Sequence, residues 1–346
     1  MSALDALGWN DGWSAAFEPY RERGLVPGRV AVQHRGAYDV ATEDGEIRAS
    51  TPRRLVHESS SAAELPVVGD WVAVDPADST IQAVLPRRTK FSRRAPQDPQ
   101  SESAREQVVS ANLDVVFVTF PLGDDVPASV LERYLALAWE SGARPVILLT
   151  KADLEQDPDA VVSDLATLGG EVPAVALSTR TGFGLDAVRS HVPAGVTAAL
   201  VGPSGAGKST LANALAGQEL LSTGQDEGGR GGQHTTTRRQ LVSLPGAGLL
   251  IDNPGMREVH LWLADEGLGD AFPDIAELET ECRFTDCRHE TEPGCAIKKA
   301  LADGRLAPER WERYRELRRE LAELDEKLAR RERLRARRRR PGAESP

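Results

Sequence analysis

The chain has 346 residues, of which 40% are hydrophobic and 27% charged, a balance typical of folded proteins with more than one domain. Its formal net charge of −11 argues against a protein that coats nucleic acid generally. The first residues lack the basic and apolar regions of a signal peptide, and no apolar run is long enough to span a bilayer. We therefore expect a cytoplasmic protein without a membrane partner.

The N-terminal part predicts short strands. Residues 1–27 form an extension to which the sequence assigns no function, and strand-like runs then follow one another over 28–95. The dipeptide Asp44-Gly45 signals a hairpin turn, and no segment has the length of a helix. About five short strands favour a small closed barrel, for which an OB-fold, with its oligonucleotide-binding face, is the first choice. A purely structural β-domain fits the same pattern equally well.

The pattern then changes from β to α/β. Residues 96–110 are rich in Pro, Gln, Ser and charge and predict a linker. Over 111–271, buried-type strands such as 114–120 and 145–149 alternate with helical segments such as 128–142. This alternation indicates a mostly parallel sheet covered by helices on both faces.

A phosphate-binding motif interrupts this domain. The stretch from 202 to 210 fits the pattern G-x-x-x-x-G-K-[ST] and lies between an apolar strand, 198–201, and a helix, 211–216. Glycines let successive N–H groups point at phosphate oxygens, and the helix N-terminus adds partial positive charge. Lys208 is expected to act in catalysis at the β- and γ-phosphates, while the Ser209 hydroxyl binds Mg²⁺. The predicted contacts of this loop are Gly202, Pro203, Ser204, Gly205, Ala206, Gly207, Lys208, Ser209 and Thr210.

Two strand ends predict a guanine site. Thr150-Lys151-Ala152-Asp153 follows a buried strand and resembles the N-K-x-D motif of GTPases, so Thr150, Lys151 and Asp153 are predicted contacts. The Asp of that motif accepts two N–H bonds from the guanine edge, a pair of donors that adenine does not offer. Thr150 stands in place of Asn and is expected to weaken guanine affinity without abolishing specificity. Ser178 begins Ser178-Thr179-Arg180, which matches the S-A-x element that supports the base.

Two further segments suit Mg²⁺ and the γ-phosphate. Asp252-Asn253-Pro254-Gly255 resembles the D-x-P-G motif, in which the Asp carboxylate orients Mg²⁺ through water and the Gly N–H contacts the γ-phosphate. Asp252 and Gly255 are therefore predicted contacts. The glycine-rich stretch 228–237 includes Thr235 and Thr236 and predicts a switch segment that orders around these groups.

The residue that positions the attacking water is less evident. Met256 stands where Ras-like GTPases keep a water-orienting Gln, and its side chain cannot orient water. His234, just before the threonines of the switch segment, is the candidate for this catalytic role.

The order of the motifs is unusual. The base-reading motifs at 150 and 178 precede the phosphate loop at 202, whereas conventional GTPases run the other way. Each motif keeps its place at the end of a strand, so the order predicts a circular permutation of the GTPase domain.

The C-terminal part predicts a metal site and a long helix. Cys282, Cys287, His289 and Cys295 form the pattern C-x4-C-x-H-x5-C, which offers a closed tetrahedral ligand set typical of one structural zinc ion. This region, 272–328, also contains a helix from about 308 with an apolar seam from Trp311 to Leu328. The arginine-rich tail, 329–346, is compatible with an rRNA contact and equally with a solvated helix end.

Together these motifs resemble the ribosome small subunit-dependent GTPase A family over roughly residues 28–325. The resemblance implies a multidomain α/β protein with an OB-type β-barrel, a circularly permuted P-loop GTPase domain and a C-terminal zinc-binding helical domain. It also implies hydrolysis of GTP to GDP and phosphate with Mg²⁺, stimulated by the small ribosomal subunit during late maturation. The implied partners are that subunit and its rRNA, and we expect a monomer off the ribosome. The chain departs from the family pattern at Thr150, at Asn253 and in inserted glycines before His234.

Two other functions share some of these motifs. A phosphoryl-transfer enzyme such as guanylate kinase can carry the same phosphate loop, but it leaves Asp153, Asp252 and the cysteine cluster unexplained. A nucleotide-gated RNA-binding module would make hydrolysis incidental. Turnover measured with and without small subunits distinguishes these alternatives.

Overall fold

The computed structural model places most of the chain in two compact units. One comprises Met1–Ser92 with Val108–Val259, and the other Arg93–Gln107 with His260–Pro346. None of the helices described is long and apolar enough to cross a membrane. The described residues are 2–34, 36–59, 61–94, 106–122, 128–168, 172–203, 205–218, 239–252, 265–319 and 322.

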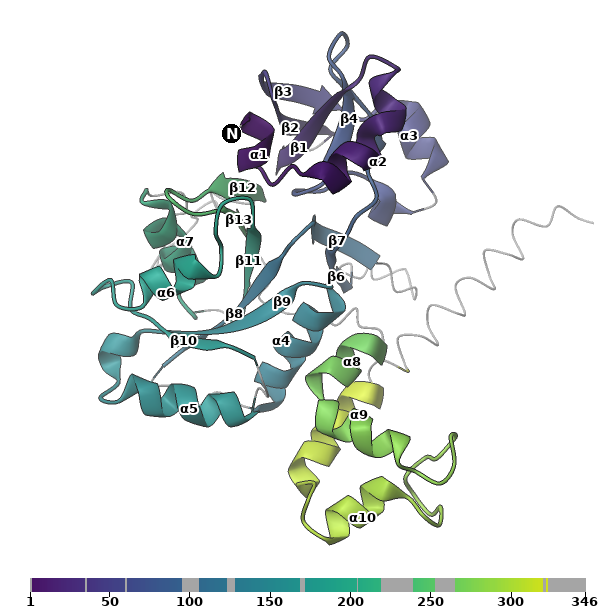
Figure 1. Ribbon diagram of the computed structural model, residues 1–346, viewed down its shortest axis with the longest axis vertical. Coiled ribbons are helices and arrows are strands. Elements are labelled where there is room, and N and C mark those ends of the chain that lie inside the picture. The colour runs from purple at the N-terminus through teal and green to yellow at the C-terminus, as the bar shows by residue number, and fades with distance from the viewer. Residues whose placement is uncertain are drawn as a thin grey trace, which may run out of the picture. The chain divides into compact units, whose positions relative to one another are not determined.

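Five strands near the N-terminus close into a barrel (Figure 1). They follow the order β1-β2-β3-β5-β4, and an additional pairing of β1 with β4 closes the ring. Burial alternates along β2, and apolar side chains such as Val30, Val40 and Ile81 fill the interior. The predicted OB-type barrel is therefore confirmed. Its strands are β1 (Val26–Gln33), β2 (Ala37–Thr42), β3 (Gly45–Ser50), β4 (Trp71–Asp75) and β5 (Thr80–Val84).

The N-terminal extension packs against the barrel in a buried cluster separate from the one that fills the barrel interior. It forms two helices, α1 (Ala3–Ala6) and α2 (Asp11–Arg21). Trp13 and Phe17 of α2 are only 4% and 1% exposed and belong to the same buried cluster as Trp71 of the barrel. Large aromatic side chains stabilise a fold through the area they bury, so this extension contributes to the stability of the barrel.

Two short elements were not predicted. A six-residue helix, α3 (Arg53–Glu58), and a 3-10 turn, η1 (Ala62–Glu64), connect β3 to β4, and both are too short for helical periodicity to show. Strand β7 (Glu106–Ala111), which pairs with β6 (Lys90–Arg94), occupies part of the segment predicted as a linker. Its apolar residues explain the strand, because Val108 and Ala111 are buried beside Val67.

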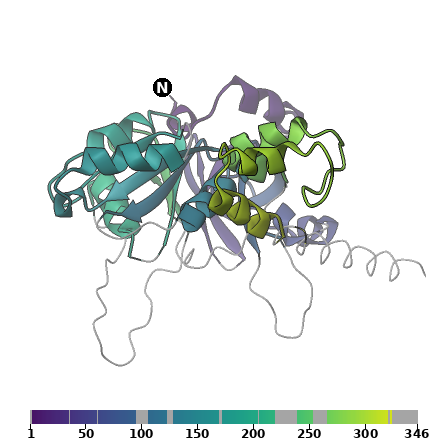
Figure 2. The ribbon, with the colours of Figure 1, turned by 90° about the horizontal axis from the view of Figure 1, so that it is seen from below.

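A second set of strands forms the predicted α/β sheet. Its order is β10-β9-β8-β11-β13-β12, and all neighbours are parallel except the pair of β12 with β13. Strand β11 lies between β8 and β13 although it follows β10 in the chain, as the permutation requires. Helices cover both faces (Figures 1 and 2). The elements are β8 (Val115–Pro121), α4 (Ala128–Glu140), β9 (Arg144–Thr150), α5 (Pro158–Leu168), β10 (Ala174–Ala176), α6 (Leu185–Ser190), β11 (Thr197–Val201), α7 (Lys208–Ala216), β12 (Gln240–Ser243) and β13 (Leu249–Asp252).

The barrel and the α/β sheet are joined by strand pairing. Val32 of β1 pairs with Gln240 of β12, so that the two parts form one eleven-stranded sheet. Backbone hydrogen bonds therefore connect the barrel to the edge strand that follows the predicted switch segment.

A buried arginine reinforces this junction. The Arg29 side chain, on β1, donates to the backbone carbonyl groups of Leu7, Gly69 (3.3 Å) and Asn112 (3.1 Å). Its guanidinium also lies 5.3 Å from the centre of the Trp71 ring. Burial lowers the pKa of Arg29 to about 10, which leaves the group charged at neutral pH. One side chain thus connects the N-terminal extension, the barrel and the segment that enters β8.

The second compact unit is helical. Phe272 and Ile297 form its centre with Tyr314 and Leu317, which lie on the predicted apolar seam. Leu321, Leu324 and Leu328 of that seam, like the arginine-rich tail, lie outside the described residues. The helices are α8 (Asp265–Ala271), α9 (Pro273–Thr280), α10 (Ala296–Ala302) and a helix over 308–319.

We expect Arg29→Met to lower the free energy of unfolding by about 2–4 kcal/mol, because it leaves buried carbonyl groups without donors. Urea unfolding followed by circular dichroism measures the change. Arg21→Met is the matched control, since the Arg21 side chain is 56% exposed and its pairing with Glu18 is a surface contact. An Arg29→Met protein as stable as the control would contradict the role of this buried guanidinium.

Candidate functional site

Those predicted nucleotide contacts that the structure describes lie at the carboxyl edge of the parallel sheet. Val118 of β8 pairs in parallel with Val201, the last residue of β11, and Ala199 of β11 pairs in parallel with Ile251 of β13, so these strands end at the same edge of the sheet. The loops that follow β9, β10 and β11, together with the last residue of β13, therefore open at the same edge. Ligands of α/β proteins bind at this place.

The phosphate loop depends on its glycines. Gly202 has a φ of 141°, and a Cβ atom on it would lie 2.1 Å from the Thr119 carbonyl oxygen. Only glycine can therefore begin the loop this close to β8. Gly207, with a φ of 79°, precedes α7 and has no side-chain cap, which leaves the first N–H groups of the helix for a ligand. Ser204 lies outside the described residues.

Lys208 lies across the phosphate loop. Its Nζ donates to the carbonyl oxygens of Gly202 at 2.7 Å and Pro203 at 2.6 Å. The ammonium is thus held at the loop that its motif assigns to phosphate. Ser209 and Thr210 follow in the first turn of α7, where both are exposed.

Thr150 connects the base-reading turn to the phosphate loop. Its side chain is buried at the end of β9, and its Oγ1 lies 2.9 Å from the Ala206 carbonyl oxygen and 3.3 Å from that of Phe120. A hydroxyl has one proton to donate, and the shorter contact is with the loop. The hydroxyl therefore supplies a tether between two ligand-binding segments.

Asp153 and Ser178 form the second predicted pair. Ser178 Oγ donates to Asp153 Oδ1, and the Ser178 residue is fully buried. This bond, and then the bonds and charge of Arg180, hold the pKa of the Asp153 carboxyl below its usual range. The carboxylate is consequently an acceptor only, as two guanine N–H donors require. Lys151, just before it, is exposed and adopts a left-handed backbone with a φ of 60°.

One participant at this carboxylate was not predicted. Arg180 donates to Asp153 Oδ2 from Nε at 2.8 Å and lies 2.7 Å from it through Nη2. The signal was available, because Arg180 belongs to the same three-residue element as Ser178, but the motif assigns only backbone groups to the base.

Several predicted residues cannot be placed. His234, Thr235, Thr236 and Gly255 lie outside the described residues, and Asp252 is described only as the last residue of β13. The pairing of Ala199 with Ile251 sets Asp252 level with the end of β11, where the phosphate loop begins.

The predicted metal ligands lie together in the second unit. One ligand atom from each lies within 4.8 Å of every other. His289 Nδ1 is 3.6 Å from Cys282 Sγ and 3.4 Å from Cys295 Sγ. Tetrahedral zinc, with Zn–S of about 2.3 Å and Zn–N of about 2.0 Å, sets such ligands about 3.5 Å apart. The donor set, Cys282, Cys287, His289 and Cys295, is therefore compatible with zinc.

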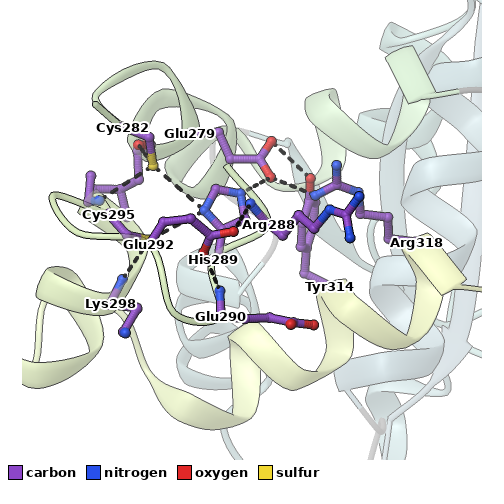
Figure 3. A network of polar contacts seen from close by, with 12 residues as sticks. Glu279, Cys282, Arg288, His289, Glu290, Glu292, Cys295, Lys298, Tyr314 and Arg318 are labelled. Atoms are coloured by element: carbon purple, nitrogen blue, oxygen red, sulfur yellow. Dashed lines mark hydrogen bonds and ion pairs between the residues drawn. The ribbon is translucent and has the colours of Figure 1, made fainter. Parts of the chain in front are cut away.

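A carboxylate outside the motif orients the histidine (Figure 3). His289 Nε2 lies 3.2 Å from Glu279 Oε1, which leaves Nδ1 toward the sulfur atoms. Glu279 also accepts from the Tyr314 hydroxyl at 3.1 Å and from Arg318 at 2.9 Å. Such outer carboxylates fix the tautomer and orientation of metal-binding histidines. Glu279 was not predicted, because nothing in the spacing of the motif includes it.

Comparison with known proteins agrees with this geometry. The family model of the RsgA GTPase matches residues 84–262, just over half of the chain, including the phosphate loop and the Asp153 turn. The chain belongs to the RsgA GTPase family. Two curated relatives are each named Small ribosomal subunit biogenesis GTPase RsgA. The one from Opitutus terrae is 43% identical, covering 95% of this chain and 94% of its own length. The one from Streptomyces coelicolor is 46% identical, covering 92% and 87%.

Solved structures show the same permuted fold. YjeQ from Thermotoga maritima matches with a TM-score of 0.62 and 25% identity, covering 86% of this chain and 99% of that chain. YloQ, a circularly permuted GTPase, matches with a TM-score of 0.60 and 23% identity, covering 86% and 96%. A second family model, of a 50S ribosome-binding GTPase, matches residues 197–328. That match begins at the first residue of β11, as expected when a conventional domain order is compared with a permuted one. Membership of a GTPase family implies that the protein binds a guanine nucleotide and Mg²⁺.

We expect Thr150→Val to weaken GDP binding about tenfold, because the Ala206 carbonyl loses its donor and the loop its tether, a loss of roughly 1–2 kcal/mol. Thr150→Ser keeps the hydroxyl and serves as the control. Titration with a fluorescent GDP analogue compares the two with the parent protein. Equal affinity in all three would contradict the tether.

Proposed function

We propose that the protein hydrolyses GTP to GDP and phosphate with Mg²⁺, and that it assists the late maturation of the small ribosomal subunit, which stimulates hydrolysis. One observation carries the proposal: Asp153 with Ser178, Thr150 and the phosphate loop meet at one edge of a permuted sheet. The name shared by the curated relatives supports the subunit as partner. We further propose that the protein contacts rRNA and works in the cytoplasm as a monomer when off the ribosome.

Each proposed phosphate contact has a chemical task. The N–H groups of the loop and of the first turn of α7 would face the phosphate oxygens. Lys208 would exchange its carbonyl partners for the more strongly accepting β- and γ-phosphates. Mg²⁺, held by Ser209 and through water by Asp252, would neutralise charge on the phosphate oxygens.

Hydrolysis requires a water molecule in line with the bond that breaks. The water oxygen bonds to the γ-phosphorus while the bond from that phosphorus to the bridging oxygen of GDP breaks. His234 remains the proposed residue that positions this water, and the N–H of Gly255 and the hydroxyls of Thr235 and Thr236 remain proposed γ-phosphate and Mg²⁺ contacts.

The proposed base site accounts for the choice of nucleotide. The ionised Asp153 would accept the two N–H groups of guanine, and the stem of Lys151 would lie along the base. The Thr150 tether keeps this turn at a constant distance from the phosphate loop. A guanylate kinase reads its guanine elsewhere and has no use for the Asp153–Ser178 pair, so this pair favours the GTPase.

We also propose one structural zinc ion in the second unit, bound by Cys282, Cys287, His289 and Cys295. Three thiolates and an imidazole complete a tetrahedron and leave no position for a reacting water. The metal would contribute folding energy to this unit directly, because its ligands come together only in the folded chain.

We expect purified small subunits to raise the GTP hydrolysis rate at least about tenfold, since ribosome-dependent GTPases complete their catalytic site on a partner. Phosphate release is measured with small subunits, with large subunits and with neither.

Lys208→Ala should lower the stimulated rate at least about hundredfold, through loss of charge at the phosphates. Equal stimulation by large subunits would contradict the proposed partner, and full turnover by Lys208→Ala would contradict the site.

We expect the purified protein to carry one zinc ion per chain and Glu279→Gln to bind it roughly tenfold more weakly, because His289 loses its charged partner. Competition with a chromophoric chelator measures this affinity. Glu277→Gln, on the same helix and exposed, is the control. A protein that carries no zinc, or a Glu279→Gln variant that holds it as tightly as the control, would contradict this assignment.

A further inference from the structure

Arg180 is paired with Asp153, the carboxylate that the proposed base site requires for guanine. Its Nε and Nη2 both lie within hydrogen-bond distance of Asp153 Oδ2, at 2.8 and 2.7 Å, while Ser178 Oγ donates to Oδ1. Three donors therefore already converge on one carboxylate. Asp153 and Arg180 both belong to the described part of the α/β domain, and Asp153 is the acidic group to which Arg180 is paired there.

The number of acceptor positions limits what Asp153 can do next. An ionised carboxylate has about four lone-pair positions, of which Ser178 and Arg180 use three. The guanine edge brings two N–H donors, one more than the remaining position can accept. The Ser178 bond is compatible with base binding, because it reaches Asp153 from the buried side. The Arg180 contact is the one that must open.

Exposure indicates the same conclusion. The Asp153 side chain is only 12% exposed, whereas the Arg180 side chain is 73% exposed. The guanidinium thus lies on the solvent side of a carboxylate that is otherwise covered, where a ligand would arrive. Its Nε–H and Nη2–H groups lie on a planar N–C–N unit, as the N1–H and N2–H donors of guanine do, and both are directed at Asp153 Oδ2.

We propose that Arg180 is a positioning residue that orients the Asp153 carboxylate in the nucleotide-free protein, and that guanine must displace it to bind. This inference rests on the proposed function, because it assumes that Asp153 reads the base. Arg180 then competes with guanine, and the cost is small, since an exposed ion pair changes an equilibrium by about two- to fivefold. A base without two donors cannot replace the guanidinium.

The test compares GDP affinity and association rate in Arg180→Ala with those of the parent protein, using a fluorescent GDP analogue. We expect affinity to rise about two- to fivefold, with the gain in the association rate, and Arg180→Lys to lie between the two. Arg189→Ala removes the same charge at a pair with Asp186 and is the matched control. The GDP affinity of Arg180→Ala divided by that of the parent should fall toward one in high salt, because salt screens the exposed Arg180–Asp153 pair. Screening of the GDP phosphates is the same in both proteins and cancels from this ratio.

Measurements in the Asp153→Ala background distinguish failure of the proposed base site from failure of the proposed Arg180 displacement. Arg180→Ala should have no effect there, because its partner is gone. If Asp153→Ala itself leaves GDP affinity unchanged, the proposed base site is wrong. If Asp153→Ala weakens binding but Arg180→Ala in the parent background leaves affinity unchanged or lowers it, the base site stands and the displacement of Arg180 is wrong.

Discussion

The parallel pairing of β11 with β8 on one side and with β13 on the other is the constraint on which the site depends. Neighbours in a sheet, and not order along the chain, decide which loops meet at an edge. The permutation therefore keeps the phosphate loop beside the base-reading turns while it changes where the chain enters and leaves. In this order β13, with Asp252 at its end, is the last strand among the described residues before the cysteine–histidine unit.

The same edge connects the site to the barrel. Gln240 of β12 pairs with Asp252 on one side and with Val32 of β1 on the other. A displacement of β12 would either break its pairing with β1 or move β1 with it. The buried Arg29 in turn bonds β1 to the segment that enters β8. The barrel is thus connected by backbone pairing to β12, the strand that lies between the predicted switch segment and Asp252 in the sequence. A change in one can reach the other without passing through a flexible linker.

The sequence predicted the barrel, the permuted sheet and the clustering of the metal ligands, because each rests on a local pattern or a fixed spacing. It did not predict α3, which is shorter than two helical turns, or β7, whose two valines stand among polar residues. Glu279 and Arg180 were missed for a different reason. Their roles depend on which side chains the fold brings beside His289 and Asp153. The metal motif does not include Glu279, and the element that includes Arg180 assigns only backbone groups to the base.

Thr150 illustrates how packing can alter the meaning of a motif. From the sequence, the loss of the usual amide implies a weaker site, because a hydroxyl is shorter and has a single proton. The fold brings the loop close to this hydroxyl: the Ala206 carbonyl oxygen lies 2.9 Å from Thr150 Oγ1. A short side chain suffices where the loop backbone passes this near. Thr150 therefore bonds directly to the loop backbone, while glycine at 207 is required by its left-handed φ of 79° and not by the space beside Thr150.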